Sequence, residues 1–88
     1  MKTAQGLIEM WLPSGGQRWL TVKQAHWFKS LLSRSPDVMP HQGLYGRTHT
    51  WLVKAGGKWY SFHITQVGSA FLAEDSTLNE EIANAKNV

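Results

Sequence analysis

The chain contains no cysteine among its 88 residues and no long apolar run. Without cysteine there are no disulfides and no thiolate metal ligands, which excludes a disulfide-stabilised secreted scaffold and a zinc ribbon. No stretch approaches the roughly 20 apolar residues of a membrane-spanning helix. The N-terminal apolar run is interrupted by Glu9 and is too short for a signal peptide. We therefore expect a cytoplasmic protein with no membrane partner.

Acidic residues are scarce over most of the sequence. Residues 1–73 contain eight Lys and Arg but only two acids, a net charge of +6, whereas residues 74–88 carry a net charge of −3. A basic segment of this kind attracts polyanions or acidic protein surfaces over long range. We interpret residues 1–73 as one basic domain and residues 74–88 as an acidic C-terminal tail. The tail either shields the basic surface or packs as a structural element.

Aromatic residues make up 11% of the chain and include five Trp. A domain this small has a thin core, and aromatic rings supply the largest apolar area per residue. Part of the aromatic set must therefore be buried. We expect the core to contain Ile8, Met10, Trp11, Leu20, Phe28, Leu31, Leu32, Trp51, Val53, Tyr60, Phe62 and Ile64.

Residues 48–67 are predicted to form a β-hairpin. Two β-rich runs flank Gly56-Gly57, and glycine tolerates the positive φ angles of a two-residue turn. This turn pairs three sets of residues: Trp51 with Phe62, Val53 with Tyr60, and Ala55 with Lys58. That side of the hairpin is mainly apolar and is expected to face the core. The other side, with Lys54, Trp59 and His63, is expected to face solvent.

The phrase WLPSGGQRWLTV at residues 11–22 resembles WLVKAGGKWYSF at residues 51–62. In the first copy, the odd-numbered and the even-numbered positions of residues 7–12 are both largely apolar, which predicts a strand with both faces buried. Pro13 should end this strand, and a short return strand should follow the turn. The resemblance reflects either a duplicated unit or two hairpins with the same turn chemistry. Burial of Trp19 and Trp59 would indicate a core on both sides of the sheet, and their exposure a binding surface.

A helix is predicted over residues 22–34, because Thr21 and Gln24 form a capping-box pattern. Its apolar residues gather on one face and its basic residues on the other. Residues 35–47 show no periodicity and are expected to form a loop. A second capping box, Thr77 to Glu80, predicts a short C-terminal helix. The alternative is a frayed tail, because so short a helix is marginal without tertiary contacts.

These elements predict a small single-domain α+β fold. A mainly antiparallel sheet, made of the hairpin 48–67 and the N-terminal strand 7–12, packs on the amphipathic helix 22–34. Residues 70–72 form a short last strand or a packed crossing, and the short C-terminal helix follows.

The histidines do not form a recognisable catalytic or metal site. None of the four has the spacing of a zinc-ligand set. A metal-free ribonuclease could use His49 or His63 with Arg47, Lys54 or Lys58, but no local motif holds two titrating groups together. We therefore expect no enzyme activity, no metal and no cofactor.

Basic and aromatic residues together favour a non-catalytic nucleic-acid-binding protein. A basic surface with stacking rings suits single strands, and basic side chains on a helix can contact the phosphates of a duplex. The candidate binding residues are Lys23, Lys29, Arg34, Arg47, Lys54, Trp59 and His63. The alternative is a small inhibitor or adaptor that binds an acidic surface of a host protein, because Trp, Tyr and Arg dominate interface hot spots. A homodimer is a further possibility.

Overall fold

The computed structural model describes residues 3–42 and 48–86 of the chain, with the side chains of residues 3–40 and 49–85. In chain order the elements are α1 (Ala4–Trp11), β1 (Gln17–Leu20), α2 (Val22–Leu32), β2 (Val38–Gln42), β3 (Thr48–Ala55), β4 (Lys58–Ile64), β5 (Ala70–Glu74) and α3 (Ser76–Lys86). None of the helices that the structure describes has the length and apolar content needed to cross a membrane.

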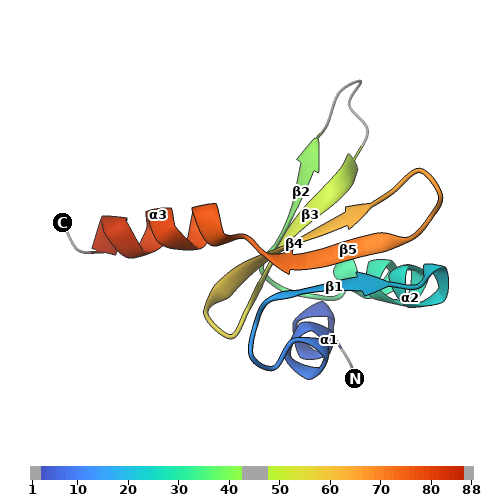
Figure 1. Cartoon of the computed structure of the whole chain (residues 1–88), viewed down its shortest axis with the longest axis horizontal. Helices are drawn as coiled ribbons and strands as arrows, with labels where there is room; N and C mark the ends of the chain where they lie inside the picture. Colours follow the sequence, from blue (N-terminus) through green and yellow to red (C-terminus); the bar gives the residue numbers. More distant parts are fainter. Residues whose placement is uncertain (1–2, 43–47, 87–88) are drawn as a thin grey trace.

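The strands form one five-stranded antiparallel sheet in the order β1-β5-β4-β3-β2. Figure 1 shows α1 and α2 on one side of this sheet, whereas α3 extends away from the end of β5. The predicted α+β fold with a mainly antiparallel sheet is confirmed.

The hairpin of β3 and β4 has the predicted register, with Trp51 opposite Phe62, Val53 opposite Tyr60 and Ala55 opposite Lys58. Both turn glycines have positive φ angles, 58° at Gly56 and 80° at Gly57. Because a two-residue turn leaves no freedom in the pairing, these glycines set the register of the whole hairpin.

The predicted strand over residues 7–12 is wrong, because this segment lies in α1 and its C-cap. The Thr3 side chain accepts a hydrogen bond from the Gly6 amide and caps the helix. The buried residues Ala4, Leu7 and Ile8 follow helical spacing. Apolar residues on both alternating sets of a short run fit a helix as well as a buried strand, and alternation alone could not separate them.

The two similar segments therefore fold differently. Residues 11–22 contain the end of α1, a turn and β1, and β1 pairs with β5 rather than with the segment before it. Only residues 51–62 form a hairpin. The resemblance reflects shared turn chemistry, since Gly15 and Gly16 also have positive φ angles, and does not mark a repeated structural unit.

Helix α2 begins with the predicted capping box. The Thr21 hydroxyl accepts from the Gln24 amide, and the Gln24 side chain accepts from the Thr21 amide, both at 3.1 Å. The helix ends at Leu32, two residues before its predicted end. Within the segment 35–47 that was expected to be a loop, residues 38–42 form the edge strand β2, and residues 43–47 lie outside the described part of the chain. The five residues of β2 show no periodicity of their own, and the strand is defined by its pairing with β3.

The core lies between the sheet and the two helices on its covered face. The Phe28 ring of α2 and the Phe62 ring of β4 are 4.5 Å apart between centroids, and both side chains are fully buried. Most of the predicted core is buried, and Trp11, Trp51 and Ile64 are partly buried against it. Met10 was wrongly placed in the core: its side chain is 51% exposed, because α1 directs it away from the sheet.

Helix α3 is anchored through a side-chain amide. The Trp59 amide donates to Asn79 Oδ1 at 2.7 Å, and Asn79 Nδ2 donates to the Trp59 carbonyl at 3.1 Å. The side-chain amide of Asn79 thus bonds to the Trp59 backbone as the backbone of a neighbouring strand would, just beyond the end of β5. The helix is confirmed, but its cap is Asp75, whose Oδ1 accepts from the Leu78 amide, and not the predicted Thr77.

Asn79→Ala should release α3 from the sheet. It removes two hydrogen bonds and leaves a part-buried amide unsatisfied, which costs about 1–3 kcal/mol. Hydrogen exchange of the α3 amides and of the Trp59 amide should then accelerate. Asn84→Ala is the matched control, since Asn84 is exposed on the same helix. Equal protection in the two variants would contradict the anchoring role of Asn79.

Tyr60 makes folding stability sensitive to alkaline pH. Burial, reinforced by the nearby Glu74 carboxylate, raises the pKa of the Tyr60 phenol above its ordinary value. The folded state then holds the phenol proton more tightly than the unfolded chain. Stability is therefore lost as pH rises through the ordinary tyrosine pKa of about 10 towards the raised value. Tyr60→Phe should decline less steeply than wild type in denaturant titrations over this range. Parallel pH profiles would refute this.

Candidate nucleic-acid interface

The sheet face opposite α1 and α2, here called the open face, is not crossed by any of the described helices, and α3 lies beside it near Trp59 (Figure 1). Side chains alternate between the two faces of each strand, so the residues between the core positions belong to this face. From one edge of the sheet to the other, its described side chains are Gln17, Trp19, Phe71, Ala73, Trp59, Ser61, His63, Thr50, Leu52, Lys54 and Met39.

Two aromatic rings and a histidine lie side by side across three strands of the open face. Trp19 of β1 pairs with Phe71 of β5, and Phe71 pairs with His63 of β4. The Trp19 and Phe71 rings are 4.9 Å apart between centroids, and the Trp19 side chain is 62% exposed. Adjacent strands are about 4.8 Å apart, so the three side chains form a ring row about 10 Å long.

The orientation of His63 is set by its neighbour on β3. Its Nδ1 atom lies 2.8 Å from the Thr50 hydroxyl, which makes a hydrogen bond across the two strands. A surface cavity of about 590 Å³ adjoins this end of the ring row, lined by His49, His63, Ile64, Thr65 and Gln66. The ring row therefore leads into a concave polar region.

Three of the predicted binding residues, Lys54, Trp59 and His63, lie on the open face. Lys54 and His63 are exposed, as expected. Trp59 was expected to be exposed, but its side chain is half-buried, because Asn79 and Ile82 of α3 line the same surface hollow.

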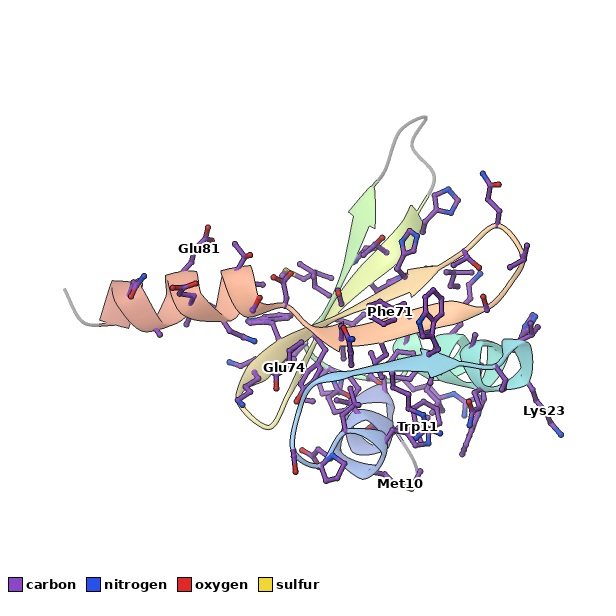
Figure 2. All side chains as sticks on the ribbon, viewed as in Figure 1. Met10, Trp11, Lys23, Phe71, Glu74 and Glu81 are labelled. Carbon is purple, nitrogen blue, oxygen red and sulfur yellow. The ribbon has the colours of Figure 1, made fainter. Side chains whose placement is uncertain are left out.

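Three further basic candidates lie on the helical side of the sheet. Lys23, Lys29 and Arg34 are exposed on α2 or just beyond its end. Figure 2 shows Lys23 on α2, remote from Phe71 on the sheet. The Lys29 ammonium lies 5.8 Å from the Trp51 ring centroid, near the β2 side of α2. One flat ligand cannot touch both sets, and Arg47 lies outside the described residues.

Phe71 was missed by the sequence prediction, and Trp19 was named as a ring whose exposure would indicate a binding surface but not as a candidate binding residue. Trp19 is exposed, whereas Trp59 is half-buried. In β5, Ala70 and Leu72 are buried while Phe71 and Ala73 are not, but all four residues are apolar, so the sequence shows no alternation that would place Phe71 on the outer face. Its contact with Trp19 joins strands 52 positions apart in the chain. No local pattern encodes that pairing.

Comparisons with protein-family models, with curated proteins and with solved structures find no match to this chain. Among the side chains that the structure describes, no three His, Asp or Glu residues are close enough together to hold a metal ion. The function must therefore be inferred from the surfaces of the fold.

The exposure of the ring row can be measured by fluorescence. Trp19 should contribute most to the fluorescence that acrylamide quenches, because the Trp19 side chain is the most exposed of the large apolar residues on the open face. Trp19→Phe should therefore lower the quenchable fraction more than Trp51→Phe, which removes a half-buried ring on the covered face. A larger effect from Trp51→Phe would contradict this arrangement of the sheet.

Proposed function

We propose that this protein binds single-stranded nucleic acid on the open face, without catalysing a reaction. The observation that carries the proposal is the Trp19–Phe71 ring pair, with Trp19 exposed, beside His63 on a sheet face that none of the described helices crosses. In one common class of RNA-binding domain, aromatic side chains on neighbouring strands of an open sheet stack two or three unpaired bases. Base stacking tolerates any sequence, because every base has a π face.

The charges of the open face support an anionic ligand. Every described residue of this face is neutral or basic. Lys54 lies opposite Trp59, four residues along β3 from Thr50 beside the ring row, and provides a cation for a phosphate group further along a bound strand. Exposed basic residues on α2 add to the positive potential of the body, which raises the rate of encounter with nucleic acid. A chain without disulfides is suited to the cytoplasm, which is where we place this activity.

The ring row favours a single strand over a duplex. In a duplex the base faces are stacked on one another and cannot reach a flat protein surface, whereas the bases of a single strand can lie on Trp19 and Phe71. The basic α2 surface would accept duplex phosphates, but it offers no comparable base contact. The two surfaces therefore predict different ligand preferences.

Binding should be measured with fluorescein-labelled oligo(dT) and oligo(U) of about 15 nucleotides, a length that covers typical single-strand site sizes, and with a duplex of equal length. Trp19→Ala and Phe71→Ala should each weaken single-strand binding by about 1–3 kcal/mol, the usual value of one stacked base. Lys54→Ala should lower the slope of log K against log salt by about 0.7.

Variants on the helical side provide the controls. Trp27→Ala removes an exposed ring of α2, and the triple change Lys23→Ala, Lys29→Ala and Arg34→Ala removes its cations. Neither should change the single-strand affinity at high salt by as much as Trp19→Ala. Loss of binding in the triple variant alone, or a preference for the duplex, would move the site to α2 and refute the proposal.

A further inference from the structure

The two edges of the sheet differ in what they offer to another strand. Along β1, the Glu74 amide donates to the Gly16 carbonyl at 2.9 Å. Because backbone groups alternate in direction along an antiparallel strand, Arg18 and Leu20 also bond towards β5. Gln17 and Trp19 therefore direct their N–H and C=O groups away from the sheet. Both residues are exposed, and β1 is the terminal strand.

The opposite edge is protected by a proline. The Lys54 amide donates to the Asp37 carbonyl at 3.0 Å, so Met39 bonds inward and the intervening Val38 and Pro40 face outward. Pro40 has no N–H to donate, and such a residue prevents a further strand from adding to an edge. The β1 edge has no proline, which leaves it as the site for strand addition.

The side chains beside the β1 edge favour a partner strand with a carboxylate. The Arg18 guanidinium lies 5.4 Å from the Trp11 ring centroid, on the helical side of the edge. Trp11 in turn contacts the Trp27 ring at a centroid distance of 6.0 Å. Among the described side chains, no carboxylate forms an ion pair with Arg18. On the other side of the edge stands the exposed ring of Trp19.

A second copy of this chain is poorly suited to the same position. An antiparallel pair of β1 strands that used the outward groups of both Gln17 and Trp19 would place Arg18 directly opposite Arg18 of the second copy. Like charges directly opposite each other destabilise a strand pair. Shifting the register to pair Trp19 with itself would oppose Gln17 to Thr21, whose N–H and C=O are already used at the start of α2.

We propose that the β1 edge binds an extended segment of another protein, with a carboxylate opposite Arg18 and apolar residues on both sides of it. Backbone hydrogen bonds to Gln17 and Trp19 would hold the segment, and its alternate side chains would select it. The carboxylate would meet Arg18, and the flanking apolar side chains would lie against the Trp19 ring. This site uses the backbone of β1 and Arg18, which base stacking on the open face does not, but the two sites share the Trp19 ring.

Two synthetic nine-residue peptides test the proposal, one with a Val-Glu-Val centre and one with a Val-Lys-Val centre. The glutamate peptide should bind about five-fold more tightly, as expected for exchanging an opposite-charge pair with a like-charge pair across two strands. Binding should slow hydrogen exchange of the Gln17 and Trp19 amides while leaving the Val38 amide unchanged. Arg18→Glu should reverse the peptide preference.

Two further variants make the test decisive. Arg34→Glu changes the net charge by the same amount at a position beyond the end of α2, and should keep the original preference. Gln17→Pro removes one outward N–H and should abolish binding of both peptides. The proposal is overturned if Arg18→Glu leaves the preference unchanged, if no peptide protects the β1 amides, or if sedimentation shows a dimer that Gln17→Pro dissociates.

Discussion

The contact between Phe28 and Phe62 determines how the rest of the molecule is arranged. Phe62 lies on the central strand β4, is fully buried, and also packs against Trp51 with a centroid distance of 5.6 Å. Because Phe28 belongs to α2, this contact holds the helix on one face of the sheet. Helix α1 lies on the same face, and α3 extends away from the end of β5 (Figure 1). The other face is therefore left open, and its side chains are available for binding.

The unequal edges follow from the same chain path. The chain enters the sheet at one edge through β1, crosses by α2 to the other edge, and then fills the sheet strand by strand until β5 pairs with β1. The two edge strands, β1 and β2, are the first two strands in the sequence. In β2 an outward position is occupied by Pro40, and in β1 the outward positions are occupied by Gln17 and Trp19. Strand addition is thereby limited to one edge, which also limits unwanted association.

Local chemistry made part of the fold predictable. The Gly56-Gly57 turn determines the complete register of the β3–β4 hairpin, and the Thr21–Gln24 capping box determines the start of α2. The α1 segment was wrongly predicted to be a strand because its apolar residues fit both a helix and a buried strand. The Thr3 cap, which favours a helix, lies before the predicted strand 7–12. Strand β2 was missed because its stability comes from pairing with β3 rather than from its own five residues.

The candidate site was only partly predictable for a related reason. His63 and Lys54 lie within one hairpin, and the turn alone places both on the outer face. The ring pair of Trp19 and Phe71 instead depends on the pairing of β1 with β5, which closes the sheet across almost the whole chain. Such long-range pairings carry a loop-closure cost and form only with tertiary support. Because Trp19 and Phe71 meet only through this long-range pairing, the sequence around each residue contains no pattern that identifies it as part of the site.

The separation of charge from the ring row bears on how an anionic ligand would be held. The α2 cations face away from the open face, so their field can accelerate encounter without contacting a strand lying on Trp19 and Phe71. Among the described residues, Lys54 is the cation that defines part of the open face. Equilibrium affinity there would depend mainly on stacking, which salt screens weakly, while the rate of association would fall with ionic strength. The α2 cations would then attract the nucleic acid, and the aromatic side chains of the sheet would hold it.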